Sequence, residues 1–122
     1  MPRHVDGGTI INIGSVAGTG PQPGSAAYTA AKAGLLALTR ALALEWAPKV
    51  RVNHVTAGPV RTEAAGYPGI GGVIPMGRPA GPRDVANACL YLAGDLASYM
   101  TGADLAVHGG GEVPARHVVT RD

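Results

Sequence analysis

The hydrophobic pattern of the chain predicts three short strands. Thr9–Ile13 is an apolar run between glycines, which is typical of a buried strand. Val50–Thr56 alternates apolar and polar residues, although imperfectly, and is interpreted as a second strand. Ala103–Val107, which precedes a run of glycines, is interpreted as the third strand.

Two stretches between these strands have the composition of helices. Ala26–Ala47 consists mostly of good helix formers, with Ser25 before it as a candidate N-cap residue and Pro48 after it as a stop. Pro82–Leu96 carries apolar residues at helical spacing, which we expect on the buried side of a second helix. These residues are Val85, Ala88, Cys89, Leu92 and Leu96.

The order strand, helix, strand, helix, strand predicts an α/β fold with a Rossmann-like parallel sheet and flanking helices. Ligands of such sheets bind outside the carboxyl ends of the strands. Here those ends are Gly14–Ser15, Thr56–Thr62 and the residues from His108 onward. Residues 57–80 form a long loop, which in a compact domain is usually functional, and residues 112–122 are expected to form a loose tail.

Composition narrows the class of protein. The 122 residues suit one domain, and a charged fraction of 15% with a net charge of +2 does not fit a disordered polyelectrolyte. The single cysteine, Cys89, excludes a disulfide scaffold and any cysteine-based zinc site, and it favours a reducing, cytoplasmic location. Its place on an apolar helical face favours a packing role over a nucleophilic one. The four histidines are scattered, so no metal site is expected.

Neither a membrane nor a nucleic acid is an expected partner. The first eight residues, MPRHVDGG, contain no apolar run and so do not resemble a signal peptide. Lys32, Arg40 and Glu45 interrupt the most apolar stretch, whereas a spanning helix needs ~20 residues with few or no charges. The arginines are scattered singly and form no basic stripe interleaved with aromatic residues.

Three polar residues near the first strand could carry chemistry. Ser15 lies at the carboxyl end of that strand, and Tyr28 and Lys32 lie one turn apart on the same face of the first helix. A nearby ammonium group favours the ionised form of a phenol, so Tyr28 could exchange a proton with a substrate oxygen near neutral pH. Ser15 could hold that oxygen through a hydrogen bond.

These residues belong to a longer series of motifs that resembles the short-chain dehydrogenase/reductase family. The resemblance extends over Gly7–Gly111 and combines a strand-end serine, a Tyr-x-x-x-Lys motif and a later strand with its threonine. The matching segments are NIGS (12–15), YTAAK (28–32), RVNHVTAGPVRT (51–62), GRP (77–79) and YMTGADLAVHGG (99–110).

The resemblance implies hydride transfer between NAD or NADP and a small alcohol or ketone. Tyr28 would be the general acid/base, Ser15 would orient the substrate oxygen, and Lys32 would also bind the nicotinamide ribose. The backbone of Val60 would meet the carboxamide of the nicotinamide, and Thr62 would add a hydroxyl group. The implied cofactor-binding residues are Tyr28, Lys32, Gly58, Pro59, Val60 and Thr62.

The chain departs from the family pattern in three ways. Ala57 stands where the family usually has proline, and His108 stands where it usually has aspartate. The family's opening strand, glycine-rich phosphate loop and helix have no counterpart. Thr19–Ala26 imitates the glycine-rich loop only superficially, because Pro21 and Pro23 lack the N–H groups that a phosphate needs.

We therefore expect residues 1–122 to form a single partial domain, the second half of a doubly wound fold. Two hypotheses of different classes follow. The chain is the catalytic half of an oxidoreductase that needs another chain or an upstream segment for nucleotide binding, or it is a truncated, catalytically silent fragment that acts at most through association. The missing neighbour would leave an apolar edge, so a homo-oligomer or association with another chain is expected.

Overall fold

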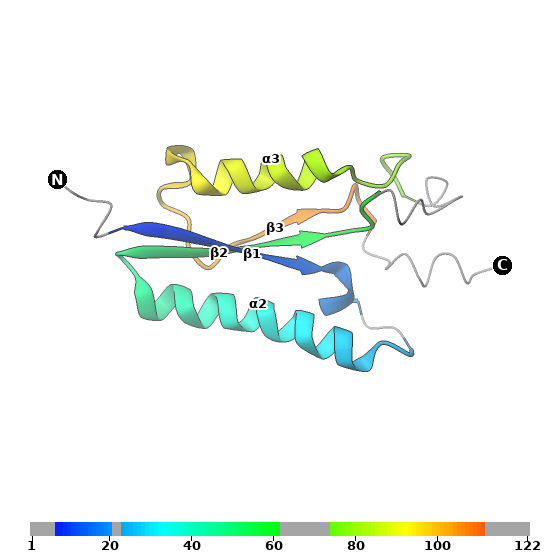
Figure 1. Ribbon diagram of the computed structural model, residues 1–122, viewed down its shortest axis with the longest axis horizontal. Coiled ribbons are helices and arrows are strands. Elements are labelled where there is room, and N and C mark those ends of the chain that lie inside the picture. The colour runs from blue at the N-terminus through cyan, green and yellow to red at the C-terminus, as the bar shows by residue number, and fades with distance from the viewer. Residues whose placement is uncertain (1–6, 21–22, 62–73, 112–122) are drawn as a thin grey trace.

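The computed structural model describes residues 7–20, 23–61 and 74–111. Three parallel strands, β1 (Gly8–Ser15), β2 (Val50–Ala57) and β3 (Asp104–Val107), form one sheet in the order β1-β2-β3. Their arrows point in the same direction in Figure 1. The predicted parallel sheet is therefore confirmed, and each strand lies within two residues of its predicted bounds.

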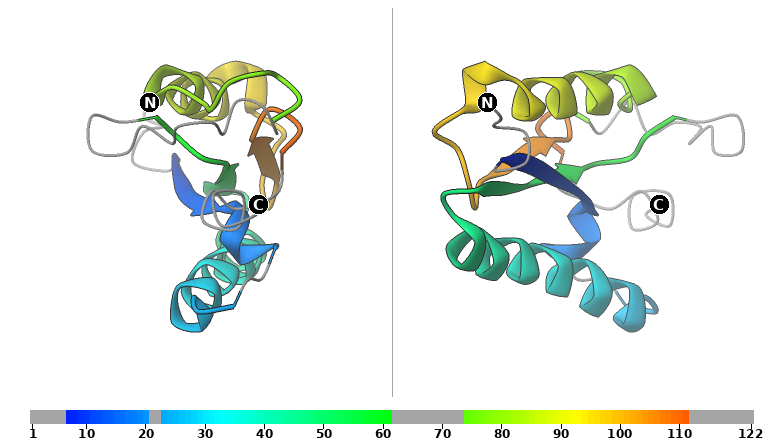
Figure 2. Two further views of the ribbon diagram at one scale, coloured as in Figure 1. Left: turned by 90° about the vertical axis from the view of Figure 1, so that its right-hand side faces the viewer. Right: turned by 60° about the vertical axis from the view of Figure 1, so that its left-hand side comes forward.

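Two helices cover opposite faces of this sheet. α2 (Ala26–Trp46) packs on one face and α3 (Pro82–Ala93) on the other, as the two orientations in Figure 2 show. Short 3-10 turns, η1 (Val16–Gly18) and η3 (Asp95–Ala97), follow β1 and α3 respectively. The molecule thus has the layers helix, sheet, helix, and the predicted α/β, Rossmann-like fold class is confirmed.

The three strands end together at one edge of the sheet. In the register of the two parallel pairs, Ser15 is opposite Ala57, and Ala57 is opposite Val107. The N–H of Gly58 donates to the carbonyl of Val107 at 2.9 Å, which continues the alignment one residue further. The aligned ends form what we call the carboxyl edge, where parallel sheets of this type place their ligands.

One cluster of the apolar core lies between the sheet and α3. Val55 of β2, Leu92 of α3 and Ala97 of η3 are completely buried. Partly buried apolar side chains pack against them, namely Ile11, Val85, Ala88, Cys89, Met100, Leu105 and Val107. Four of the five residues predicted on the buried side of the second helix therefore contact the core, and Cys89 has the packing role that was expected.

Leu96, the fifth of these residues, is 86% exposed, so its prediction as a core residue was wrong. The helix ends at Ala93, and Gly94 follows in an extended conformation with φ −94° and ψ 180°. Because the backbone changes direction at Gly94, the residues after it no longer follow the helical spacing of α3. Ala97 then takes the inward position that Leu96 would have occupied on an uninterrupted helix.

The segment after β1 also differs from expectation. Three glycines and two prolines between Ser15 and Ser25 predict a loop here, yet η1 gives the segment one 3-10 turn. Ser25 occupies the N-cap position of α2, but its side chain makes no capping hydrogen bond, so the predicted hydroxyl cap was wrong. The predicted cofactor contact Thr62 and the predicted tail at 112–122 lie outside the described residues.

β1 forms one edge of the sheet that the described residues build. Ile10 and Ile13 on this strand are 37% and 40% exposed, although the pattern is that of a buried strand. The structure therefore shows the apolar edge that the sequence predicts. In the parts of the chain that the structure describes, no helix is long and apolar enough to cross a membrane.

Candidate functional site

Ser15 is held at the carboxyl end of β1 by the turn that follows it. Its backbone is extended, with φ −144° and ψ 153°, and it is the N-cap residue of η1. The Ser15 Oγ accepts a hydrogen bond from the N–H of Ala17 at 3.0 Å. A serine hydroxyl can accept one bond and still donate its own proton, so this cap leaves the donor for another oxygen.

Tyr28 and Lys32 meet on one face of α2, as their spacing predicts. The Lys32 Nζ lies 5.7 Å from the centroid of the Tyr28 ring, within the distance at which a cation is attracted to an aromatic face. Tyr28 is 51% exposed and lies in the first turn of the helix, near the carboxyl edge. Its phenol is therefore accessible to a ligand at that edge.

Lys32 also links α2 to the strand that carries Ser15. Its Nζ donates to the carbonyl of Ile13 at 3.4 Å, two residues before Ser15. Gly18 of η1 packs against the same helix, because a Cβ at this glycine would be 2.9 Å from the carbonyl carbon of Lys32. Only glycine allows so close an approach without a shift. The structure thus brings the elements that carry Ser15, Tyr28 and Lys32 together.

The predicted nicotinamide segment, Gly58–Val60, continues directly from β2 at the same edge. Gly58 needs to be glycine, because a Cβ there would be 2.7 Å from the Cβ of His108. The carbonyl of Pro59 accepts from the N–H of Ala80 at 2.9 Å, and the N–H of Arg61 donates to the carbonyl of Ala80 at 2.7 Å. These two hydrogen bonds, made by the residues on either side of Val60, form an isolated parallel β-bridge between Val60 and Ala80.

This bridge determines which way the backbone of Val60 faces. Successive residues of an extended strand direct their N–H and C=O groups to alternate sides. Because Pro59 and Arg61 supply the hydrogen bonds to Ala80, the N–H and C=O of Val60 are directed away from it. An amide ligand such as a carboxamide can pair with a donor and an acceptor arranged in this way.

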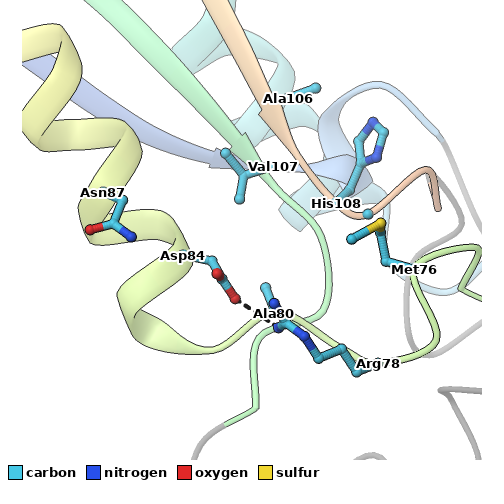
Figure 3. A pocket seen from close by; sticks show the side chains of 9 residues that line it. Met76, Arg78, Ala80, Asp84, Asn87, Ala106, Val107 and His108 are labelled. Atoms are coloured by element: carbon cyan, nitrogen blue, oxygen red, sulfur yellow. Dashed lines mark hydrogen bonds and ion pairs between the residues drawn. The ribbon is translucent and has the colours of Figure 1, made fainter.

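A pocket of about 360 Å³ lies beside the carboxyl end of β3 and the first turn of α3 (Figure 3). None of the residues predicted for the site lines it. Its lining consists of Met76, Arg78, Ala80, Asp84, Asn87, Ala106, Val107, His108 and Gly109.

An ion pair stands in this pocket, with the Arg78 Nη1 2.8 Å from the Asp84 Oδ2. The hydrogen bond from Arg78 and a further one from the N–H of Gly81 lower the pKa of Asp84 below its ordinary value. The carboxylate of Asp84 in turn raises the pKa of the Arg78 guanidinium. Both groups are therefore charged at neutral pH and satisfy each other.

Sequence reasoning missed a buried polar cluster that includes His54. His54 and Thr56 of β2 are 1% and 4% exposed, and both contact the carboxylate of Asp104 on β3. The signal available in the sequence was the pair of polar residues at alternate positions, His54 and Thr56, on either side of Val55. In the described ranges, no three His, Cys, Asp or Glu residues gather as metal ligands.

Comparison with known proteins identifies the family. A family model described as enoyl-(acyl carrier protein) reductase matches residues 1–112. The chain belongs to the short-chain dehydrogenase/reductase family. The motifs that resembled this family in the sequence are thus confirmed as signs of membership.

Individual relatives agree with this assignment. The chain is 45% identical over 106 residues to trans-4-hydroxycyclohexanecarboxylate dehydrogenase of Sinomonas cyclohexanicum, a match that covers 85% of this chain and 41% of the relative. It is 43% identical over 115 residues to 3-oxoacyl-[acyl-carrier-protein] reductase of Escherichia coli K12. This second match covers 88% of this chain and 46% of the relative.

A solved structure gives the same result for the fold. The crystallised 7α-hydroxysteroid dehydrogenase complexed with NADH and 7-oxo glycochenodeoxycholic acid superposes with a TM-score of 0.81 and 33% identity. This match covers 88% of this chain and 46% of that one. The chain spans less than half the length of these relatives, all of which are oxidoreductases of the short-chain dehydrogenase/reductase type.

Proposed function

We propose that this chain is the catalytic half of an oxidoreductase that transfers a hydride between NAD or NADP and a small alcohol or ketone. One observation supports this above the others. The Lys32 ammonium group lies over the Tyr28 ring and donates to the strand that ends at Ser15. In a member of a family of oxidoreductases, this arrangement supports the assignment of Tyr28 as the acid/base, Lys32 as its cationic partner and Ser15 as a hydroxyl donor.

Each of the three side chains has a distinct task in the reduction direction. The hydroxyl of Ser15, whose Oγ already accepts from Ala17, donates to the ketone oxygen and orients the carbonyl. Tyr28 delivers a proton to that oxygen as the carbonyl carbon gains a hydride. The positive charge of Lys32 stabilises the phenolate that remains on Tyr28. In the oxidation direction, the same phenolate accepts the proton of the alcohol.

The residues at the carboxyl edge suit the nicotinamide end of a cofactor. The backbone N–H and C=O of Val60 face away from Ala80, which leaves a donor and an acceptor for the carboxamide. Lys32 has three N–H donors and one of them reaches Ile13, so others can hold a ribose hydroxyl. A bound nicotinamide cofactor supplies or accepts the hydride. Another chain or another segment would bind its phosphates, and Thr62 is proposed as a further hydroxyl contact.

A second candidate function is association without catalysis. The chain covers 41% and 46% of the two relatives, and β1 exposes Ile10 and Ile13 at the edge of the sheet. A fragment of this kind would bind another chain of the family through that edge. We place either activity in the cytoplasm, because Cys89 is a free thiol that packs against the core.

Two experiments test the proposal. Direct titration of the chain with NADH and NADPH measures binding, and the oxidation of either cofactor in the presence of a small cyclic ketone measures activity. We expect the chain to bind nucleotide through its nicotinamide end, and the Lys32→Ala variant to weaken this binding at least tenfold. We expect the Tyr28→Phe variant to lower the rate of ketone reduction by about 100-fold or more, because it removes the acid/base.

Matched controls come from the same chain. Lys49 is the other lysine, and Tyr91 is a partly exposed tyrosine on α3, on the opposite side of the sheet. The Lys49→Ala and Tyr91→Phe variants should bind and react like the wild type. No binding at millimolar nucleotide and no ketone reduction would contradict the catalytic proposal for this chain alone and favour association.

A further inference from the structure

The buried cluster around His54 lies on the face of the sheet that α2 covers. Val55 points into the core beneath α3, so its neighbours His54 and Thr56 point to the opposite side. The His54 Nδ1 is 2.9 Å from the Asp104 Oδ1. The hydroxyl of Thr56 donates to both oxygens of the same carboxylate, at 2.8 and 2.9 Å.

These contacts fix the orientation of the imidazole. A carboxylate only accepts hydrogen bonds, so the Nδ1 of His54 carries a proton and donates to Asp104. The Nε2 of the same ring is buried and has no hydrogen-bond partner among the residues that the structure describes. A buried nitrogen without a hydrogen-bond partner destabilises a fold. Hydrogen bonding therefore does not explain why this side of the His54 ring is buried, and its packing contacts need to be considered.

The Nε2 side of the ring packs directly on Gly14, the residue before Ser15. A Cβ placed on Gly14 would overlap the Nε2 and Cε1 atoms of His54. Gly14 does not have a positive φ, so space rather than backbone conformation requires glycine here. Gly14 lies on the same face as Asn12, whose side chain donates to Thr39 of α2 at 3.0 Å.

We propose that His54 is a positioning residue for Ser15. Asp104 and Thr56 hold the imidazole, and the imidazole fills the space above Gly14 that a side chain would otherwise occupy. The end of β1 is thereby fixed, and with it the Ser15 Oγ that accepts from Ala17. The consequence for catalysis rests on the proposed function of Ser15, whereas the effect on the structure at Ser15 does not.

The test uses a pair of complementary substitutions. The Asn side chain in the His54→Asn variant retains an N–H that can donate to Asp104, but it removes the ring atoms above Gly14. The Gly14→Ala substitution then supplies a methyl group to the vacated space. The amide of Ala17 reports on Ser15, because its N–H donates to the Ser15 Oγ, and the Ser15→Ala variant defines the signal without that bond.

In 1H–15N spectra of the whole chain, we expect the His54→Asn variant to move the Ala17 amide towards its position in Ser15→Ala. The double variant Gly14→Ala/His54→Asn should move it back towards the wild type. Val85→Ala, which trims the core on the opposite face of the sheet, should leave the amide unchanged even though it lowers stability. An unchanged Ala17 amide in His54→Asn, or no return in the double variant, would overturn the proposal.

Kinetics give the second readout. We expect the His54→Asn variant to lower kcat for ketone reduction about tenfold with little change in KM, because it misplaces a positioned group without removing it. Gly14→Ala in that background should recover most of the loss. If the wild type shows no turnover while the Ala17 amide behaves as expected, the proposed function fails and the positioning role of His54 stands.

A measurement on the wild type covers the case in which His54→Asn does not fold. Long-range 1H–15N correlation of the imidazole should show a protonated Nδ1. A nuclear Overhauser effect should connect the Hε1 of His54 with the Hα protons of Gly14. An unprotonated Nδ1, or the absence of this contact, would overturn the proposal without any variant.

Discussion

Asp84 performs two local tasks at the start of α3. Its carboxylate accepts from the N–H of Gly81 at 2.8 Å, which caps the helix, and from Arg78 at 2.8 Å. An acidic side chain in the first turn also interacts favourably with the positive end of the helix dipole. The hydrogen bond from Arg78, followed by the one from Gly81, lowers the pKa of Asp84 in the folded chain.

The lowered pKa of Asp84 predicts a loss of stability in acid. In the unfolded chain this carboxyl takes up a proton near its ordinary pKa of 3.8, whereas in the folded chain it does so only at lower pH. The unfolded state therefore binds more protons in this range, and the stabilisation, which is complete above about pH 5, is lost as the pH falls through the folded-state pKa.

Urea unfolding of the wild type and of Asp84→Asn, from pH 7 to pH 3, measures this contribution. The advantage of the wild type should be constant down to about pH 5 and shrink below about pH 4. It should also be smaller at high salt, because Asp84 and Arg78 are partly exposed. If the wild type and Asp84→Asn differed in stability at pH 3 as much as at pH 7, the lowered pKa of Asp84 would be contradicted.

Residue contacts could be predicted where they are local. Tyr28 and Lys32 are four residues apart on one helix, so helical geometry alone brings them together. His54 and Asp104 are fifty residues apart, and only the register of β2 with β3 places them opposite each other. Sequence reasoning recognised both strands but had no means to align them, so it assigned no role to His54.

At the scale of elements, apolar spacing predicted which helices and strands form but not where α3 ends. The pattern of Pro82–Leu96 continues in sequence past Gly94, but the backbone becomes extended at that glycine. Glycine is a poor helix former, and its low propensity weakens the helix where packing does not compensate. Consequently Leu92 is completely buried, while Leu96, four residues later, is 86% exposed.

This break predicts opposite outcomes for two similar substitutions. Leu92→Ala should lower the free energy of unfolding by about 2–5 kcal/mol, because it leaves a cavity beside Val55 and Ala97. Leu96→Ala should change it by less than about 0.5 kcal/mol, since the side chain is already in water. Urea midpoints at equal slope measure both values. Similar losses for the two variants would mean that the helix continues through Gly94.

At the scale of the whole molecule, the described sheet has three strands and two open edges. β3 contributes only four residues to its edge, but β1 contributes eight, among them the exposed Ile10 and Ile13. A long, apolar edge strand is a template for pairing with another chain. The chain spans less than half of its relatives' length, and the β1 edge is the longer of the two open edges in the described residues.

We therefore predict that the chain associates through β1 in a concentration-dependent manner. A charge on an edge strand opposes strand pairing, so Ile10→Lys should weaken association by about tenfold or more in sedimentation velocity experiments. Leu44→Lys places the same charge on α2, where the leucine is already 85% exposed, and should have little effect if the strand edge is the interface. A larger effect of Leu44→Lys than of Ile10→Lys would assign the interface to α2. A wild type that stays monomeric and melts cooperatively across the micromolar range would show that three strands and two helices suffice without a partner.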